Sequence, residues 1–379
     1  MGENRTQLFV PVFFCLAMLG LFTDLASAQD LDLFPVRQAG KVGFIDSTGK
    51  IVISPRFDSA LSANDVTFSE GLAAVQVGNK WGYIDRTGEF VIQPKFDDTP
   101  SLFTEGLAQV VIKVNIIEKT VLKDKSTIRE ETYGFIDRNG NLVESLKFIG
   151  EYTRFVDGLA KVKKGEKFGY VDKTGRFVIE ARFANAEDFS EEVAAVRTNK
   201  SFSSLEGGDE SSVKYGFIDR SGKFVIKPQF DGVESFSEGL AAVNIGYKYG
   251  YIDKTGKLVI PARFDSVFPF SEGLAKVVIG DRSGFIDTKG KLVISPRFAH
   301  SGFGNSINYN GFKGGLAAVE VNGKTGYIDK TGKLVISARY RYGFDFNSGL
   351  ALVHEGEIET GHSYYINKSG KVVWEHKNN

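Results

Sequence analysis

The sequence is poor in the residues that carry most nucleophilic and metal-binding chemistry. Of its 379 residues one is cysteine and four are histidine. The cysteine, Cys15, lies in an apolar stretch near the start of the chain. A chain cleaved after that stretch would have no disulfide, no reactive thiol and no cysteine metal site. Its stability would depend on the burial of apolar side chains.

An excess of charge of either sign is also lacking. The 47 basic residues equal the 47 acidic ones, and both signs are mixed along the chain. A nucleic-acid binder or a protein held on an acidic membrane surface needs a basic patch, so neither partner is expected. The sequence has no glycine loop that would cradle a phosphate and no serine in a nucleophile elbow. It predicts no cofactor and no catalytic constellation.

Long apolar runs are absent except at the start. "MGENR" is a short charged segment, "LFVPVFFCLAMLGLF" is apolar, and "LASAQD" offers an Ala-Ser-Ala cleavage site before Gln29. This order is typical of a secretory signal peptide over residues 1–28, with a retained membrane anchor as the alternative. The mature chain, 29–379, is then predicted to be a secreted or periplasmic monomer without a membrane span.

What the chain does contain is one motif repeated nine times. "GFIDSTGK", "GYIDRTGE" and "GYIDKTGK" are copies of a block that begins at an anchor glycine, and the anchors at Gly216, Gly250 and Gly284 are 34 residues apart. A ninth, divergent copy reads "YYINKSGK" from Tyr364. Because a catalytic site is normally needed once, a block repeated this often indicates architecture.

One copy, residues 239–270, shows how a unit should fold. "LAAVNI" alternates apolar and polar residues, "YGYID" and "KLVI" are short strands, and Gly-rich turns separate them. We expect a three-stranded antiparallel meander, with a possible short fourth strand in the following crossover. The fold class is all-β, a tandem array that forms an open β-solenoid-like superhelix. A closed β-propeller is the alternative. It comes second because the chain has nine units, whereas propellers usually have four to eight blades.

The Asp and Gly of each block are predicted to form its turn. The aspartate side chain can accept backbone hydrogen bonds, and the glycine can adopt a positive φ. Calcium would require more acidic or amide neighbours at close spacing, so no metal is expected. The turn residues are Asp46, Asp85, Asp137, Asp172, Asp219, Asp253, Asp287 and Asp329, with Gly49, Gly88, Gly140, Gly175, Gly222, Gly256, Gly290 and Gly332.

Three aromatic positions recur in each unit and account for much of the high phenylalanine count of 32. They follow the anchor glycine, end the third strand and lie in the crossover, as Tyr251, Phe264 and Phe270 do in one copy. We interpret them as the core between stacked units. The crossover glutamates, such as Glu70, are expected to pair with arginines at the end of the third strand, such as Arg56. These pairs would set the register between neighbouring units.

Three insertions interrupt the period, at 112–132, 197–212 and 299–312. The first alternates Val and Ile with charged residues and predicts a lengthened hairpin; the other two are loops. Insertions in repeat arrays often form binding faces. An enzyme on this scaffold would use residues that break the repeat, and the candidates are His300, Asn305, Asn308, Tyr309 and His354.

The pattern "NKWGYIDRTGEFVIQPKFDD" followed by "FTEGLAQV" resembles the WG (KWG) repeat family, and the match extends over 31–375. The resemblance implies a bacterial, often exported repeat protein and transfers no catalytic residues. Only Trp81 keeps the tryptophan of the motif. The variation at that position in the other copies predicts partial exposure.

The sequence therefore favours a non-enzymatic protein-binding or scaffold module outside the cytoplasm. The first alternative is binding of a cell-envelope glycan through exposed aromatic rings, and the second is an exported hydrolase or lyase on a propeller. The candidate binding residues are Trp81, Tyr133, Tyr215, Tyr249, His300, Asn308 and Tyr309.

Overall fold

All regular elements in the described part of the chain are β-strands. A computed structural model describes residues 32–61, 67–121, 124–149, 154–198, 214–300, 311–356 and 362–376. The predicted signal peptide, most of the second insertion and 301–310 of the third lie outside these residues. The all-β fold class is confirmed.

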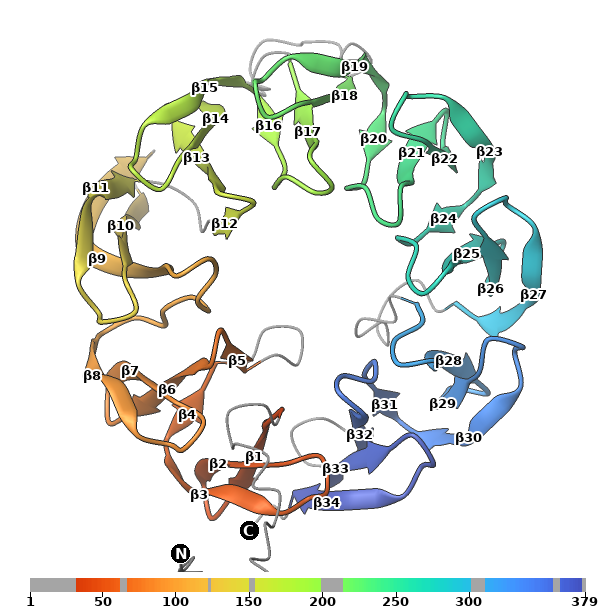
Figure 1. The fold of residues 1–379 in the computed structure, drawn as a ribbon, viewed down its shortest axis with the longest axis horizontal. Coiled ribbons are helices and arrows are strands. Elements are labelled where there is room, and N and C mark those ends of the chain that lie inside the picture. The colour runs from red at the N-terminus through yellow and green to blue at the C-terminus, as the bar shows by residue number, and fades with distance from the viewer. Residues whose placement is uncertain are drawn as a thin grey trace, which may run out of the picture.

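Each sequence repeat forms one small antiparallel sheet, which we call a blade. The three strands expected from the sequence are present in every blade, and most blades add a short strand from the crossover. The "KLVI" strand lies at the outer circumference and the crossover strand lies nearer the centre (Figure 1). The uncertain fourth strand is therefore real, but it has only two residues.

The strand bounds follow the repeat. Blades 1 to 3 contain β1 (Phe34–Gln38), β2 (Lys41–Ile45) and β3 (Ile51–Phe57); β4 (Ser59–Ala60), β5 (Phe68–Ser69), β6 (Leu72–Val77), β7 (Lys80–Ile84) and β8 (Phe90–Phe96); and β9 (Ala108–Val121), β10 (Asp124–Ile136) and β11 (Leu142–Ile149). Blades 4 to 6 contain β12 (Phe155–Val156), β13 (Leu159–Lys164), β14 (Lys167–Val171) and β15 (Phe177–Phe183); β16 (Asn185–Ala186), β17 (Ala194–Arg197), β18 (Tyr215–Ile218) and β19 (Phe224–Phe230); and β20 (Gly232–Val233), β21 (Ala241–Ile245), β22 (Lys248–Ile252) and β23 (Leu258–Phe264). Blades 7 to 9 contain β24 (Ser266–Val267), β25 (Leu274–Ile279), β26 (Arg282–Asp287) and β27 (Leu292–Ala299); β28 (Ala317–Val321), β29 (Lys324–Ile328) and β30 (Leu334–Tyr340); and β31 (Tyr342–Gly343), β32 (Leu350–Glu355), β33 (His362–Asn367) and β34 (Val372–His376).

The blades remain separate sheets, and none closes into a barrel. Blades 7 and 8 are linked by a single pair, Ala299 with Glu320. The first insertion is the lengthened hairpin that was expected, with Asp124 opposite Val121 at its turn.

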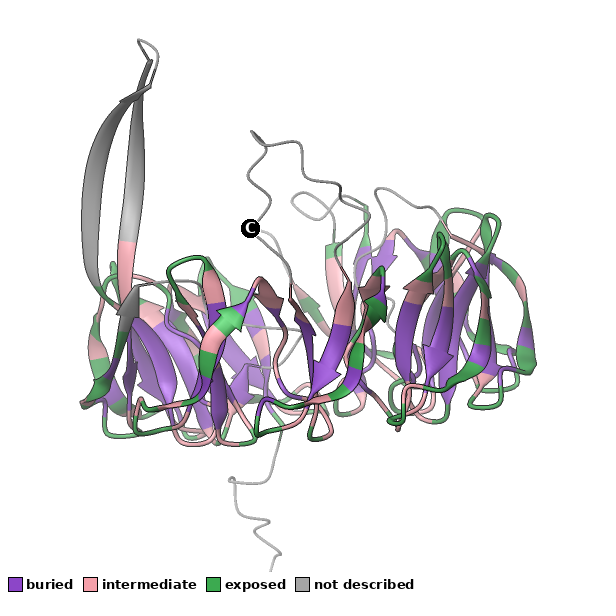
Figure 2. Ribbon diagram, turned by 90° about the horizontal axis from the view of Figure 1, so that it is seen from above, coloured by how far each residue is buried: buried purple, intermediate pink, exposed green. Residues whose placement is uncertain are grey.

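The blades stand around a central opening and form a flat disc (Figures 1 and 2). The ninth blade lies against the first: the Phe34 and Tyr365 rings pack edge to face 5.6 Å apart, and the Tyr365 hydroxyl donates to the Pro35 carbonyl at 3.1 Å. The two ends of the array are therefore in contact. This is the closed arrangement that the sequence left as the alternative to an open superhelix.

Side-chain packing, and not an exchanged strand, closes the ring. The sheet of blade 1 contains only β1, β2 and β3, and that of blade 9 only β31 to β34. A shared core cluster joins them through Phe34, Val36, Ile45, Leu350 and Tyr365. A ring closed in this way contains no exchanged strand that the sequence could reveal.

The same aromatic contact recurs between all neighbouring blades. The ring after the anchor glycine packs edge to face against the crossover ring that leads into the next blade, as in Tyr251 with Phe270, whose centroids are 4.9 Å apart. The other pairs are Phe44–Phe68, Tyr83–Phe103, Phe135–Phe155, Tyr170–Phe189, Phe217–Phe236, Phe285–Phe312 and Tyr327–Phe346. The predicted inter-unit core is thus present.

The turn glycine of each blade packs on the outer strand of the preceding blade. A Cβ at Gly88, whose φ is +91°, would lie 2.9 Å from the Ile53 side chain of blade 1. At Gly49, with φ +90°, a Cβ would lie 2.2 Å from the Val373 carbonyl oxygen of blade 9. The closing interface therefore repeats the internal one.

The anchor glycine has a different role, because the outer strand bulges over it. In blade 6 the pairing moves from Tyr251–Ile260 to Tyr249–Phe264, so β23 has two residues more than β22 between these pairs. A Cβ at Gly250 would lie 2.4 Å from the Ile260 carbonyl oxygen under this bulge. Blade 9 has no bulge in this stretch, because Tyr365 pairs with Trp374 and Ser363 pairs with His376, so both strands advance by two residues. Tyr364 occupies the anchor position there.

The turn aspartate makes the contacts that the sequence predicts. In blade 6 the Asp253 carboxylate accepts hydrogen bonds from the Thr255 N–H at 2.9 Å, the Thr255 hydroxyl at 2.5 Å and the Lys257 N–H at 3.1 Å. The hydrogen bond from the Thr255 side chain is the main cause that holds the pKa of Asp253 below its ordinary value. Asn367 of blade 9 accepts the equivalent three bonds from Ser369 and Lys371.

Gly250→Ala should destabilise the protein, because the added Cβ meets backbone that cannot rotate away. We expect a cost of roughly 1–3 kcal/mol, which is typical of overpacking. Gly232→Ala is the control, since its Cβ would make only an ordinary 3.5 Å contact with Asn244. Thermal unfolding of both variants tests this, and equal melting temperatures would contradict the account.

Asp253→Asn should shift the melting temperature at pH 7 by about 2 °C or less, because Asn367 shows that an amide oxygen serves the same turn. The pH dependence should change more clearly. A carboxyl group with a lowered folded-state pKa stabilises above its unfolded pKa, near 3.9, and this stability is lost as pH falls through the folded value. Unfolding measured from pH 7 to 2 should show a shallower acid loss in the variant, and parallel curves would refute the assignment.

Candidate functional site

The inner turns of the ring combine an unusual backbone with a repeated carboxylate. Glu70 and Gly71 both have positive φ, +51° and +79°, and the same pair recurs at Glu105–Gly106, Glu238–Gly239 and Glu272–Gly273. Two consecutive residues of this kind form the tight hairpin turn that joins antiparallel strands. A non-glycine residue in this region is uncommon, so contacts that stabilise each glutamate in this conformation are expected.

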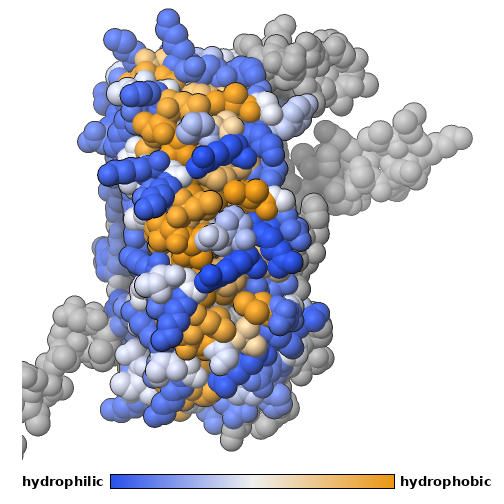
Figure 3. Space-filling model, turned by 90° about the vertical axis from the view of Figure 1, so that its right-hand side faces the viewer, coloured by the Kyte–Doolittle hydropathy of each residue, from blue (hydrophilic) through white to orange (hydrophobic). Residues whose placement is uncertain are grey.

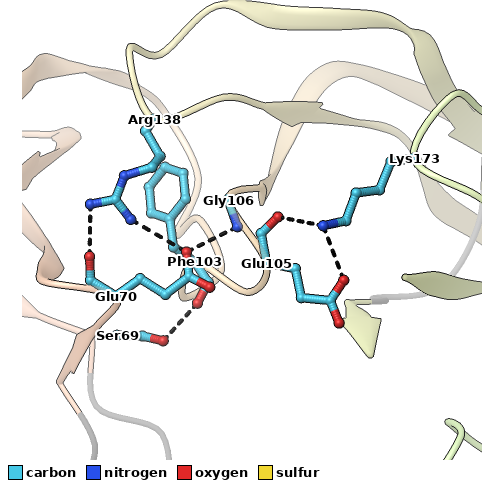
Figure 4. A network of polar contacts seen from close by, with 7 residues as sticks. All are labelled: Ser69, Glu70, Phe103, Glu105, Gly106, Arg138 and Lys173. Carbon is cyan, nitrogen blue, oxygen red and sulfur yellow. Dashed lines mark hydrogen bonds and ion pairs between the residues drawn. The ribbon is translucent and has the colours of Figure 1, made fainter. Parts of the chain in front are cut away.

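Those contacts reach the next blade (Figure 4). The Glu70 carboxylate accepts the Gly106 N–H at 2.9 Å, and Arg138 donates to the Glu70 carbonyl at 2.8 Å. In the following turn Lys173 donates to the Glu105 carbonyl at 2.8 Å and lies 3.1 Å from its carboxylate. Each glutamate therefore fixes the position of one blade relative to the next.

This inner network corrects the partner that the sequence suggested for the glutamates. Their cations come from the Asp-x-x-Gly turns, as Arg138, Lys173, Lys254 and Lys330. The arginines that end the third strands bind glycine carbonyls of the next turn, as Arg263 does at Gly290 at 2.7 Å. An arginine at that position lies at the outer circumference, whereas the glutamates lie at the inner turns, so the two cannot meet.

The tryptophan position is more buried than its variability predicted. Trp81 is 7% exposed and packs in a core cluster with Tyr83, Ile92 and Phe103. Tyr133, Tyr215 and Tyr249 are half-buried at the equivalent position. The Arg197 guanidinium lies over the Tyr215 ring at 5.7 Å. The predicted partial exposure is therefore present in these tyrosine copies but not at Trp81.

The histidines that break the repeat are not brought together in one hollow. His300 ends blade 7 with its ring against Phe268, and His354 lies in blade 9 with its ring against Phe344. A cavity of about 610 Å³ at Phe268 includes neither histidine in its lining. Burial lowers the pKa of both imidazoles. Asn305, Asn308 and Tyr309 lie outside the described residues.

A buried charged group in blades 7 to 9 was not anticipated. Lys276 is 5% exposed, and burial lowers its pKa to about 8 although the Asp345 and Glu320 carboxylates act in the opposite direction. Its Nζ lies 5.0 Å from the centre of the Phe268 ring. The sequence signal was a lysine at a position where blades 5, 6 and 8 have alanine, "LAKV" against "LAAV" or "VAAV".

The outer circumference carries a band of exposed aliphatic side chains (Figure 3). They project from the outer strands and are between 37 and 45% exposed: Ile51, Val91, Val178, Val225, Leu258, Val259, Leu292, Val293, Leu334, Val335 and Val372. We call this set the outer apolar band. The sequence did not distinguish these residues from other strand residues. The sequence of one strand does not show which of its two faces other elements cover.

A groove of about 530 Å³ interrupts the band between blades 6 and 7. Its apolar lining includes Ile260, Pro261, Ile279 and Leu292, and three cations, Arg263, Lys289 and Lys291, also line it. The side chains of Lys289 and Lys291 have no ion-pair partner among the residues that the structure describes. The groove therefore combines apolar walls with uncompensated positive charge.

A second hollow, of about 320 Å³, lies at the interface of blades 9 and 1 and contains Arg37, His354, Ser363 and His376. The His354 Nδ1 and the Ser363 hydroxyl are 2.7 Å apart. In the described ranges no group of three or more His, Cys, Asp or Glu side chains could hold a metal ion. No helix long and apolar enough to cross a membrane occurs in that part of the chain.

Solved structures of low sequence identity share the fold. A eukaryotic initiation factor is 12% identical with a TM-score of 0.61, and the match covers 92% of this chain and 96% of that one. Dipeptidyl peptidase 4 of Porphyromonas gingivalis is 11% identical with a TM-score of 0.55, and the match covers 91% of this chain but only 60% of the peptidase. Both are propeller-like, and at this identity they show the fold alone. No curated protein matches the sequence.

The repeat itself matches a known family along most of its length. The WG containing repeat matches residues 43–81, 81–113, 133–168, 168–201, 215–249, 249–282, 284–301 and 326–357. These segments cover more than half of the chain and coincide with the blades. The chain therefore belongs to the family of WG containing repeat proteins.

Proposed function

We propose that this protein is a non-enzymatic scaffold that binds another protein through the outer apolar band. The observation that carries the proposal is the exposure of paired aliphatic side chains on the outer strands of consecutive blades, as at Leu258–Val259, Leu292–Val293 and Leu334–Val335. Exposed apolar surface that continues across several elements is typical of protein interaction sites. Because the band includes residues of every blade except blade 3, it offers a partner several equivalent anchoring points.

The chemistry of the groove between blades 6 and 7 specifies the partner further. Ile279 and Leu292 would receive an apolar side chain, and Lys289 and Lys291 would face carboxylates beside it. Charge complementarity of this kind speeds association and selects the partner. We therefore propose a partner segment in which aliphatic or aromatic residues are flanked by Asp or Glu.

The remaining parts of the proposal rest on the sequence. The apolar start and the Ala-Ser-Ala site support export to the periplasm or beyond, and we therefore propose a partner outside the cytoplasm. A glycan partner would require exposed aromatic faces, and Trp81 is largely covered while the half-buried Tyr215 has Arg197 over its ring. For that reason we place a protein partner before a glycan.

The triple variant Val259→Gln, Val293→Gln and Val335→Gln tests the band. The side chains are exposed, so the melting temperature should change by no more than about 3 °C. Capture of envelope proteins by the intact protein, quantified by mass spectrometry, should show at least one partner whose recovery falls about tenfold or more in the variant.

The control variant carries Tyr247→Gln and Asp281→Gln at hairpin tips of the same region, where the side chains are 94% and 83% exposed. It should recover the partner as the wild type does. Equal recovery by the wild type, the triple variant and the control would show that the outer apolar band is not the binding surface.

A further inference from the structure

The Asp-x-x-Gly turn of blade 7 differs from the other turns in the order of its two middle residues. Blades 4, 6 and 8 read "DKTG", with a lysine before a threonine, whereas blade 7 reads "DTKG". The two residues are therefore transposed at Thr288 and Lys289. Because each of the two positions has its own partner in the ring, the transposition changes two contacts.

The first contact that blade 7 lacks is a hydrogen bond inside the turn. In blades 1, 2, 4, 5, 6, 8 and 9 the residue before the turn glycine is a Ser or Thr whose hydroxyl donates to the turn Asp or Asn, as Thr255 does to Asp253 at 2.5 Å. Lys289 has no hydroxyl. Among the described residues the Asp287 carboxylate therefore accepts only the backbone N–H groups of Lys289 at 3.0 Å and Lys291 at 2.9 Å.

The second contact that blade 7 lacks is an ion pair with the preceding blade. The residue after the turn aspartate supplies the cation for the inner glutamate of that blade, as Lys330 of blade 8 does for Glu272 of blade 7 at 3.2 Å. Thr288 cannot supply a cation. Glu238 of blade 6 still accepts the Gly273 N–H at 2.9 Å, but it has no cationic partner in the described ranges.

Blade 1 shows that a missing cation can be matched by a change of the glutamate. It has Ser47 after the turn aspartate, and the inner turn of blade 9, which precedes blade 1 in the ring, has Ser348 at the glutamate position. In blade 6 Glu238 remains although its cation has moved. A local loss of this kind, without a matching change, is typical of a position retained for function.

The transposed lysine lies in the groove between blades 6 and 7. Lys289 is exposed and lines this hollow of about 530 Å³ beside the apolar Ile279 and Leu292. The other two cations of the lining recur elsewhere: a lysine like Lys291 follows the turn glycine in blades 1, 5, 6, 8 and 9, and an arginine like Arg263 ends the third strand in blades 1, 4, 7 and 8. Lys289 is therefore the cation that distinguishes this groove from the equivalent positions of the other blades.

We propose that Lys289 fixes where the partner binds on the ring, by pairing with a carboxylate next to the aliphatic side chain that enters the groove. The outer apolar band recurs in most blades, so apolar contacts alone would let one segment bind at several blades with similar affinity. A cation present in one groove favours that position over the others. Lys289 would act within the proposed function, on which this inference rests, as the residue that selects the site.

A variant that returns the common order, Thr288→Lys with Lys289→Thr, tests the cost of the transposition. Its composition and net charge are those of the wild type, and we call it the restored-turn variant. The new threonine can donate to Asp287 and the new lysine can pair with Glu238, so the melting temperature should rise by about 1–3 °C.

The matched control introduces the blade 7 order into blade 8, as Lys330→Thr with Thr331→Lys. It removes the Lys330 contact with Glu272 and the hydroxyl bond from Thr331 to Asp329, so it should melt about 1–3 °C below the wild type. Equal melting temperatures for the wild type and the restored-turn variant would show that the transposition costs nothing, and would contradict a functional reason for it.

Binding is measured by fluorescence anisotropy with a labelled peptide of the sequence Asp-Leu-Glu-Leu-Asp and with its neutral counterpart, which has Asn and Gln in place of Asp and Glu. The wild type should bind the acidic peptide about tenfold or more tightly than the neutral one. The restored-turn variant should bind the acidic peptide about threefold or more weakly than the wild type, with the neutral peptide unaffected. The control Lys257→Gln removes an exposed turn lysine outside this groove and should bind both peptides as the wild type does.

Equal affinity of the wild type and the restored-turn variant for the acidic peptide, or no binding of that peptide up to roughly 1 mM, would overturn the role of Lys289. Failure of the proposed function has a different sign, which is equal partner recovery by the wild type and the triple variant of the outer apolar band. Loss of the partner in the triple variant, together with unchanged peptide affinity in the restored-turn variant, would leave the band as the binding surface and exclude Lys289 as its selecting residue.

Discussion

The edge-to-face contact between an anchor ring and the next crossover ring is the interaction on which the rest of the structure depends. A single blade has too little apolar surface to form a core alone, and each pair buries one ring from each of two blades. Such a pair contributes about 0.5–1.5 kcal/mol beyond the burial of its area. Because Tyr365 and Phe34 make the same contact between the last and first blades, no blade is left with an uncovered face.

Two glycines keep the blades close enough for this contact. The turn glycine lets one blade rest on the outer strand of its neighbour, and the anchor glycine lets the outer strand bulge inward within a blade. The inner glutamates then fix the relative position of neighbouring turns with charge-assisted hydrogen bonds. The repeated motif is therefore architecture. Its outward side chains are what remain available for binding.

The sequence predicted the strands, the turn aspartates and the aromatic core, because all three depend on contacts within one or two repeats. It could not predict ring closure, since Phe34 stands in a segment that does not resemble the other crossovers, and its contact with Tyr365 joins residues far apart in the chain. The pocket at His376 was missed for the same reason. The role of the anchor glycine became clear only from the bulge, which also explains why Tyr364 is tolerated where the bulge is absent. The outer apolar band was not predicted, because the alternation of apolar and polar residues in these strands is that of any strand.

The closed ring is tested most directly by a distance between its ends in solution. Spin labels on cysteines at Lys50 and Lys371 would report the closing interface, and labels at Lys291 and Lys257 would report an internal one, in protein without Cys15. Each labelled residue stands directly after the turn glycine of its blade in the sequence. These glycines are Gly49 and Gly370 for the first pair, and Gly290 and Gly256 for the second. The account predicts the same narrow distance distribution for both pairs in pulsed electron paramagnetic resonance. A longer and broader distribution for Lys50 and Lys371 alone would show an open array and contradict it.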